Sequence, residues 1–170
     1  MSEHEIIITP FEAAYQKKIE DLVLTVQNEE FNLGITAQDQ PDLPNLKAFY
    51  QDRGGEFWIA VDATQDDVLG CIGFEYLEVG AAALRKMFLK KDVRGNKTLK
   101  LAQKMYDTFL ALASRKEIKV ICLDTPLVAH AAHRFYERNG WKLAPIEELP
   151  ASYKLPKIDP KLIKFYLLRL

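Results

Sequence analysis

A strand, a short basic loop, a long helix and a second strand follow one another between residues 82 and 125. The stretch AAALRKMFL (81–89) is apolar enough for a strand, and KVICLDT (119–125) reads as a buried strand. Between them, apolar residues recur at helical spacing over 98–116. Antiparallel strands can be joined by a tight turn, whereas parallel strands need a crossover, usually a helix. The succession therefore favours a βαβ unit.

The flanking segments extend this unit into a mixed α/β domain. The elements expected before it are a strand at 5–9, a helix over 11–31, a short helix over 46–51, and two strands, EFWIAVD (56–62) and VLGCIGFEYLEV (68–79). Those expected after it are a helix that ends at Gly140 and two last strands, WKLAPI (141–146) and KFYLLRL (164–170). The chain has no repeats and no long linker, and 170 residues suit one core. We therefore expect a single domain over 1–170.

The charge of the chain is nearly balanced but unevenly placed. The net charge is −1, yet the window from Arg85 to Lys104 holds eight cations and one acid, Asp92. That window is therefore +7 and the rest of the chain −8. A basic window on an acidic protein indicates attraction to one anionic ligand, although a solvated charged face gives the same pattern. A nucleic-acid-binding module would more often be basic throughout, so we expect no nucleic-acid partner.

Cysteine usage and hydropathy indicate the compartment. Cys71 and Cys122 both lie in apolar, strand-like runs, which argues for buried free thiols in a reducing cytoplasm rather than a disulfide framework. The longest apolar runs are far shorter than a membrane span, and no apolar segment follows the polar start MSEHE. We therefore expect a cytoplasmic protein that does not associate with membranes.

The basic loop RGNKT (94–98) stands where the long helix is expected to begin. A helix start presents unpaired N–H groups and a positive dipole end, which suit a phosphate. Lys97 and Lys100 add charge, and Thr98 offers a hydroxyl that could also cap the helix. The loop has one glycine, Gly95, and matches neither the P-loop nor the dinucleotide pattern. From spacing alone, a phosphate site and a plain basic turn fit it equally well.

Four short motifs occur in one order between residues 84 and 141. They are LRKMFL (84–89), RGNKTL (94–99), LDT (123–125) and AHRFYERNGW (132–141). In this combination the chain resembles the GNAT-type N-acetyltransferase superfamily, in which a strand leads into an Arg-Gly-x-Gly-x-Gly/Ala loop and a long helix. The resemblance implies a mixed α/β GNAT fold, with a central, mostly antiparallel sheet of about seven strands flanked by helices. It also implies acetyl-CoA as cosubstrate and no metal.

The resemblance places the cosubstrate on the basic loop and the strand before it. The pyrophosphate would lie on the backbone N–H groups of 95–99, and the pantetheine arm would pair with 87–89 like an added strand. The implied cosubstrate-binding residues are Met87, Phe88, Leu89, Arg94, Gly95, Asn96, Lys97, Thr98, Leu99, Lys100, Ala129 and His133. Lys97 and Leu99 depart from the family pattern, which has small residues there, and Ala129 stands where many members place an Asn. Lys97 and Leu99, together with Ala83 at a position where many members carry a glutamate, keep a second function open, a CoA-binding sensor or regulatory protein with weak or no turnover.

The resemblance also implies catalytic roles. Tyr136 matches the family tyrosine whose hydroxyl, as general acid, protonates the departing CoA thiolate. The N–H near Met87 would polarise the thioester carbonyl. Many members carry a glutamate base where this chain has Ala83. Our candidate base is Glu75, with Glu78 as an alternative; a water relay, or an amine that arrives neutral, would need neither.

Two further groups of polar residues have simpler interpretations. His130 and His133 are three apart on a helix, but no acid or cysteine joins them at ligand spacing, so we expect no metal site. Asp124 resembles a strand-end residue that stabilises the neighbouring loop, and we expect no catalytic role for it.

The acceptor is expected to meet the first two helices and their loop. That region carries four acids and two apolar side chains: Glu29, Glu30, Asp39, Asp42, Phe31 and Tyr50. The acids favour a cationic amine acceptor, whereas a solvated acidic loop explains them equally well. The expected reaction is direct attack of a primary amine of a small molecule or peptide on acetyl-CoA in a ternary complex. Edge strands near the C-terminus could pair two subunits as a homodimer.

Overall fold

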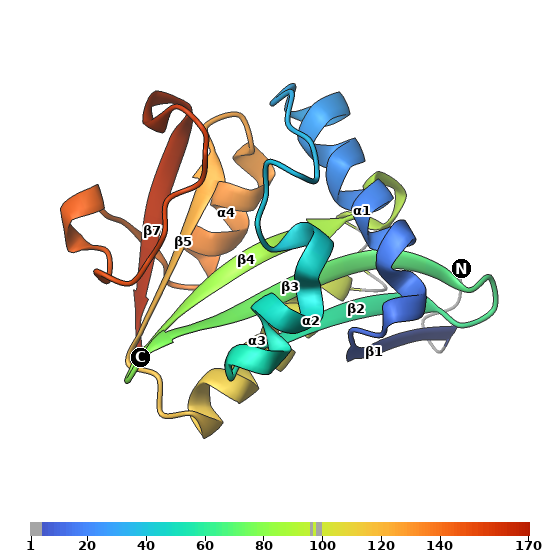
Figure 1. Cartoon of the computed structure of the whole chain (residues 1–170), viewed down its shortest axis with the longest axis horizontal. Helices are drawn as coiled ribbons and strands as arrows, with labels where there is room; N and C mark the ends of the chain where they lie inside the picture. Colours follow the sequence, from blue (N-terminus) through green and yellow to red (C-terminus); the bar gives the residue numbers. More distant parts are fainter. Residues whose placement is uncertain (1–4, 96, 98–99) are drawn as a thin grey trace.

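The computed structural model describes residues 5–95, 97 and 100–170. Its seven-stranded sheet has the order β1-β2-β3-β4-β5-β7-β6 (Figure 1). The strands are β1 (Ile6–Pro10), β2 (Glu56–Asp62), β3 (Asp67–Glu78), β4 (Ala81–Leu89), β5 (Val120–Pro126), β6 (Lys142–Leu143) and β7 (Ile163–Arg169). The α-helices are α1 (Gln16–Leu24), α2 (Leu46–Phe49), α3 (Leu101–Arg115) and α4 (His130–Arg138).

The strand pairing confirms the expected fold class. Neighbouring strands are antiparallel except β4 and β5, which are parallel and joined by α3. This is the βαβ unit expected from the sequence. The mixed α/β class, with a mostly antiparallel sheet of seven strands flanked by helices, is confirmed as well.

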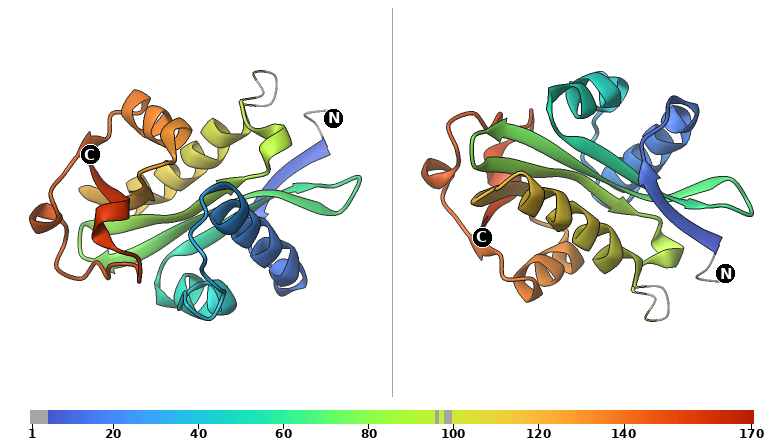
Figure 2. Two further views of the ribbon diagram at one scale, coloured as in Figure 1. Left: turned by 90° about the horizontal axis from the view of Figure 1, so that it is seen from above. Right: turned by 90° about the horizontal axis from the view of Figure 1, so that it is seen from below.

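The sheet lies between two layers of helices. Figure 2 shows α1 and α2 on one face and α3 and α4 on the other. Side chains alternate along β2, so that Trp58 packs in the cluster that includes α3, while Phe57 and Ile59 pack in the cluster that includes α1. Burial on both faces explains why the central strands are almost continuously apolar in sequence. Within the described residues, no helix combines the length and apolar character needed to cross a membrane.

Some elements end at other residues than expected. The first helical segment begins as a 3₁₀ turn (Ala13–Tyr15), and after α1 it continues as a π-helical turn (Thr25–Glu30). The strand expected at 141–146 is reduced to the two residues of β6. Pro145 lacks an N–H for strand pairing, and the chain then turns at Ile146–Glu148.

Candidate active site

The parallel strands β4 and β5 separate after a short paired stretch. They pair at Ala81↔Val120, Ala82↔Ile121 and Ala83↔Cys122, with no further pairs in the register of the described residues. Beyond that point β4 continues to Leu89 and β5 to Pro126, and the two strands diverge (Figure 1). The backbone of β4 from Leu84 onward therefore has no strand partner on its β5 side. A strand edge of this kind can accept an extended ligand.

A β-bulge lies in this exposed half of β4. Cys71 pairs with Phe88 and Gly73 with Arg85, so Lys86 and Met87 together oppose a single β3 residue. Lys86 has φ 52°, a left-handed conformation that is rare for a residue with a side chain. The Lys86 side chain reaches Asp42 on the α2 side of the sheet, while Met87 packs against the cluster on the α3 side. The bulge therefore re-aims side chains at the point where β4 leaves β5.

Arg85 is the centre of a nearly buried polar cluster beside the bulge. Its Nε donates to Glu75 Oε1 at 2.7 Å, and its Nη2 donates to the Lys154 carbonyl at 3.0 Å. The guanidinium carbon lies 4.4 Å from the centre of the Tyr153 ring, and Nη1 lies 3.6 Å from Asp124 Oδ2. Burial works to lower the pKa of Arg85, but the neighbouring Tyr153 and Glu75 outweigh it and raise that pKa. The guanidinium is therefore a permanent cation that ties the C-terminal segment to β3 and β4.

The two acidic partners of Arg85 occupy different places relative to the strand separation. Glu75, our candidate base, is buried on β3 opposite Ala83, and its carboxylate engages Arg85. Asp124 lies on β5 two residues beyond the last β4–β5 pair, and it accepts a hydrogen bond from the Tyr153 hydroxyl. Asp124 therefore lies at the wall of the separation, whereas Glu75 lies one strand behind it.

A second ion pair joins the bulge to the segment before α2. Lys86 Nζ lies 3.2 Å from Asp42 Oδ2, which also accepts a 2.6 Å hydrogen bond from the Tyr50 hydroxyl. Burial, with Asp42 adding to it, raises the pKa of Tyr50 well above its ordinary value, so the phenol remains a donor. Its ring covers Gly73, where an added Cβ would come within 2.8 Å of Tyr50 Cε1. Tyr50, expected to line the acceptor pocket, is thus fully buried in the core.

Three of the four acids expected to face the acceptor are engaged within the protein. Asp42 pairs with Lys86, and Glu30 pairs with Arg94 Nη2 at 2.6 Å. Asp39 accepts a hydrogen bond from the backbone N–H of residue 36, and the pKa of Asp39 is lowered chiefly by that bond. The remaining acid, Glu29, has an exposed side chain.

Tyr136 is held in α4 by aromatic neighbours. The centre of its ring lies 5.8 Å from that of Trp141 and 6.0 Å from that of Tyr166, and the residue is 6% exposed. Within the described residues its hydroxyl makes no hydrogen bond. Burial, followed by the negative charge of Asp124, raises the pKa of Tyr136. The result is a protonated phenol whose hydrogen is available to a ligand.

His133 and Ala129 lie at the start of α4. The Nε2 of His133 donates to the Pro126 carbonyl at 2.9 Å, which ties α4 to the end of β5. Burial lowers the pKa of His133. Ala129 is buried immediately before the helix. The rings of His130 and His133 are 5.7 Å apart, but the described residues contain no group of three or more His, Cys, Asp or Glu able to hold a metal.

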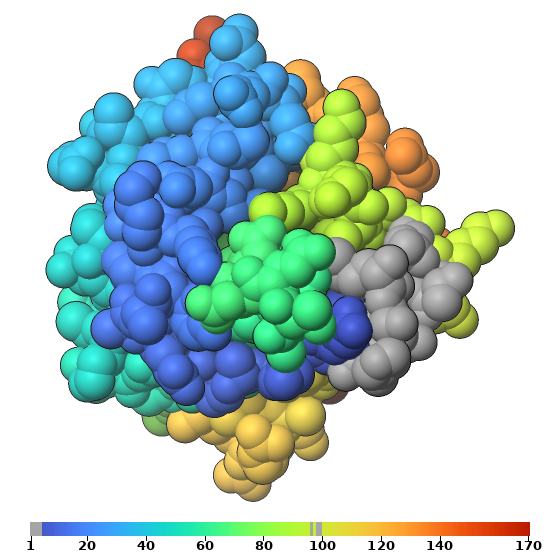
Figure 3. Space-filling model, turned by 90° about the vertical axis from the view of Figure 1, so that its right-hand side faces the viewer, coloured from blue at the N-terminus to red at the C-terminus, as the bar shows by residue number. Residues whose placement is uncertain are grey.

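The basic loop leads into the start of α3. Gly95 has φ 67°, and Lys100 immediately before α3 has φ 46° and supplies no side-chain cap. Arg94, Lys97 and Lys100 are exposed around this helix start. Asn96, Thr98 and Leu99, three of the expected cosubstrate-binding residues, lie outside the described residues. Figure 3 shows the yellow-green atoms after β4 lying against the blue atoms of the first helical segment.

The strand before this loop supplies the other expected cosubstrate contacts. Met87 and Phe88 are half-buried and Leu89 is buried. All three belong to the part of β4 that has left β5. Their backbone can therefore pair with an extended ligand without help from particular side chains.

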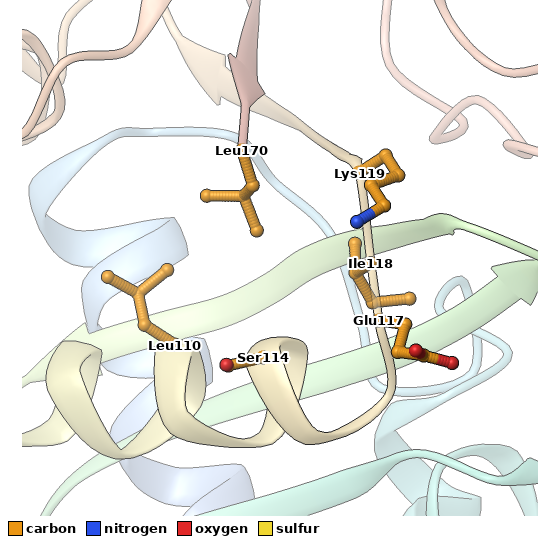
Figure 4. Close-up of a pocket in the computed structure, with 6 residues that line it drawn as sticks. All are labelled: Leu110, Ser114, Glu117, Ile118, Lys119 and Leu170. Atoms are coloured by element: carbon orange, nitrogen blue, oxygen red, sulfur yellow. The ribbon is translucent and has the colours of Figure 1, made fainter.

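A separate hollow lies away from this region. Its volume is about 330 Å³, and Figure 4 shows the residues that line it: Leu110, Ser114, Glu117, Ile118, Lys119 and Leu170. They come from the end of α3, the turn after it and the C-terminus. None belongs to the residues that the sequence predicts to bind or react.

Sequence reasoning missed two central residues of the polar cluster, Arg85 and Tyr153. They meet across 68 positions of sequence, and Tyr153 belongs to a segment without periodicity. The sequence offered a partial signal for Arg85. Arg85 stands two residues after Ala83, the position at which many family members carry a glutamate base, so the two residues share one face of the strand. No comparable signal marks Tyr153.

Comparison with known proteins assigns this mixed α/β domain to the acetyltransferase class. An acetyltransferase from Streptococcus agalactiae is 30% identical, with a TM-score of 0.89 over 98% of this chain and 99% of that one. An acetyltransferase of the GNAT family from Staphylococcus aureus is 31% identical, with a TM-score of 0.88 over 96% and 98%. The acetyltransferase (GNAT) domain model matches residues 53–143, more than half of the chain. The chain therefore belongs to the GNAT acetyltransferase family.

Two more distant matches agree with this assignment. The Xenopus tropicalis protein named "Probable N-acetyltransferase camello" is 25% identical over 107 residues, which are 62% of this chain and 47% of that protein. The match thus spans about half the length of this curated relative. The PaiA N-acetyltransferase from Thermoplasma acidophilum, solved in complex with coenzyme A, is 15% identical with a TM-score of 0.74 over the full length of both chains. At that identity the likeness concerns the fold alone.

Proposed function

We propose that the chain transfers an acetyl group from acetyl-CoA to a primary amine. The observation that carries this proposal is the separation of β4 from β5 beside Tyr136, whose ring is buried while its hydroxyl has no hydrogen-bond partner in the described residues. The names of the two bacterial relatives support acetyl transfer, and the PaiA complex supports coenzyme A as the carrier.

The donor would lie along β4 and across the start of α3. Its pantetheine arm would add to the free edge at Met87, Phe88 and Leu89, where backbone groups lack a strand partner. The first turn of α3 presents N–H groups that Lys100 does not cap, and the exposed Arg94 and Lys97 add positive charge. Ala129 and His133 would border the arm from α4. Because the His133 ring is bound to Pro126, it would act by holding α4 in place.

The reaction needs one bond made and one broken. The amine nitrogen attacks the thioester carbonyl, the C–N bond forms, and the C–S bond breaks to release a thiolate. A backbone N–H at the bulge, near Met87, would polarise the carbonyl oxygen. Tyr136 would donate to the sulfur as the general acid. A tyrosine with its ordinary pKa of about 10 is already a weaker acid than a thiol of pKa about 8.5, and burial raises the pKa of Tyr136 further, so hydrogen bonding to the developing thiolate is its main contribution.

The amine must also lose a proton, and two carboxylates are placed near the reacting position. Glu75 is our candidate base from the sequence, and its side chain is committed to Arg85. Asp124 lies at the wall of the strand separation and close enough to raise the pKa of Tyr136. The variants Glu75→Gln and Asp124→Asn test which carboxylate is the base. In the variant that lacks the base, kcat should fall about 10²-fold, and kcat should no longer decline at acidic pH. If kcat of both variants still declines at acidic pH, neither carboxylate is the base.

The acceptor is proposed to be a cationic amine of a small molecule or peptide. Acids remain in excess around the site, since Glu75, Asp124 and Asp42 outnumber the cations Arg85 and Lys86. The experiment is a panel of cationic, neutral and acidic primary amines, each tested for amine-dependent release of the CoA thiol. We expect turnover with polyamines or aminoglycosides. Turnover confined to neutral or acidic amines contradicts the cationic acceptor, and donor binding without any turnover supports the CoA-dependent sensor instead.

A further inference from the structure

The segment of residues 25–42, here called the braced segment, is attached to β4 and the loop after it at two points. One attachment is the ion pair of Glu30 with Arg94, and the other is the ion pair of Asp42 with Lys86. The segment itself contains the π-helical turn Thr25–Glu30 and the loop that leads toward α2. It therefore spans the distance between the basic loop and the bulge.

Internal hydrogen bonds make the braced segment one unit. The side-chain amides of Gln27 and Gln40 lie 2.9 Å apart in a buried pair. The Asn28 side chain donates to the Ile35 carbonyl at 2.8 Å and accepts from the Ile35 N–H at 2.9 Å. These bonds tie the π-helical turn to the loop that follows it, so we expect the two parts of the segment to move together.

The attachment at Glu30 occupies an arginine that the donor needs. Arg94 Nη2 lies 2.6 Å from Glu30 Oε1 and 2.8 Å from Glu30 Oε2, so one nitrogen serves both carboxylate oxygens. Both side chains are partly exposed, at 34% for Arg94 and 24% for Glu30. Arg94 immediately precedes Gly95 and the turn into α3, where the proposed function places a diphosphate. An arginine held by a carboxylate offers less charge to a phosphate, and the carboxylate itself repels the incoming anion.

We propose that Glu30 competes with the acetyl donor for Arg94. In the free protein Glu30 holds Arg94. The diphosphate of the donor then takes the guanidinium, and one attachment of the braced segment is released. Donor binding thereby loosens a segment that ends at Asp42 beside the acceptor side of β4. Because such coupling is reciprocal, the donor and the acceptor are expected to change each other's affinity by the same factor. The inference rests on the proposed function.

The test is calorimetric titration of the full-length protein with acetyl-CoA. Glu30→Gln should bind the donor about two- to five-fold more tightly than the wild type, the range expected for freeing one exposed ion pair. Glu29→Gln is the matched control, since it removes the same charge at the adjacent position without touching Arg94. Glu29→Gln should increase the affinity for acetyl-CoA by a smaller factor, because it only removes a negative charge at a distance from the donor. In an Arg94→Gln background, Glu30→Gln should tighten binding no more than Glu29→Gln does.

Each result of the titration either supports or refutes the competition between Glu30 and the donor. If the wild type binds acetyl-CoA and Glu30→Gln binds no better than Glu29→Gln, the competition is refuted while the proposed function stands. Weaker binding by Glu30→Gln also refutes it, because Glu30 would then orient Arg94 for the donor. No binding by the wild type overturns both. Hydrogen exchange on the unmutated protein gives a second reading: saturating CoA should speed exchange over residues 25–33, and unchanged or slower exchange contradicts release.

Discussion

At the residue scale, the hydroxyl of Tyr136 is the group whose proposed role can be tested by removing a single atom. The ring is fixed by Trp141 and Tyr166, while the oxygen has no hydrogen-bond partner within the described residues. Tyr136→Phe removes only that oxygen, so we expect kcat to fall about 10²-fold with the Kd of acetyl-CoA unchanged. Steady-state kinetics and calorimetry measure the two quantities. Tyr76→Phe, on β3, is the control, and a variant of Tyr136 with the kcat of the wild type removes this phenol from the mechanism.

His133 makes folding stability depend on pH. Burial lowers its folded-state pKa, so as pH falls below about 6.5 the unfolded chain takes up a proton that the folded chain does not. The stability associated with the neutral ring is therefore present above that pH and is lost as pH falls toward the folded pKa. Urea denaturation of the wild type and His133→Gln between about pH 7 and pH 5 tests this. The difference between the two should shrink on acidification, and parallel curves contradict the assignment.

Individual site residues were predictable only where local sequence identified them. Tyr136 and the loop at Arg94 stand in short motifs, so their positions followed from the chain itself. Arg85 and Tyr153 are 68 residues apart and meet only because β4 and the segment before β7 fold together. Long-range contacts also pair Glu75 with Arg85 and place Asp124 where β4 and β5 separate. No local sequence pattern distinguishes these two acidic residues as candidate bases.

At the scale of elements, the β4 bulge contains a strained residue, Lys86, whose side chain is ion-paired with Asp42. Lys86→Met leaves Asp42 buried without its cation, and we expect the free energy of unfolding to fall by about 2–3 kcal/mol. Chemical denaturation measures the loss. Asp42→Asn in the same chain should restore part of it, because the uncompensated charge is gone.

An exposed ion pair between α2 and the turn after it provides the matched control for this bulge variant. Lys47 and Asp52 lie 2.7 Å apart with most of both side chains in solvent. Lys47→Met should change the free energy of unfolding by less than about 0.5 kcal/mol. Equal effects of the two lysine substitutions would show that the pair at the bulge gives the strand no special support.

Most elements were predictable from periodicity, and the exceptions have physical causes. The strand expected at 141–146 lost most of its length because Pro145 cannot donate a hydrogen bond. The π-helical turn at Thr25–Glu30 follows a sequence that reads as ordinary helix, since a change of hydrogen-bond register leaves little trace in apolar spacing.

For the whole molecule, the fold divides the basic window into two parts. Arg85, Lys86, Lys90 and Arg94 are ion-paired with acids from distant segments, namely Glu75, Asp42, Asp67 and Glu30. Lys97 and Lys100 remain exposed at the start of α3, where Lys100 supplies no side-chain cap. Four of the eight cations of the window thus form internal ion pairs, and two others, Lys97 and Lys100, lie where the proposed donor carries its phosphates.

The most direct test of this account is calorimetric titration of acetyl-CoA into the wild-type protein. We predict one site per chain with micromolar affinity, because a free strand edge on β4, exposed cations and a helix start that Lys100 does not cap lie along the proposed path of the donor. An absence of binding at millimolar acetyl-CoA would contradict the account. The family fold would remain, but its donor site would be closed in this chain.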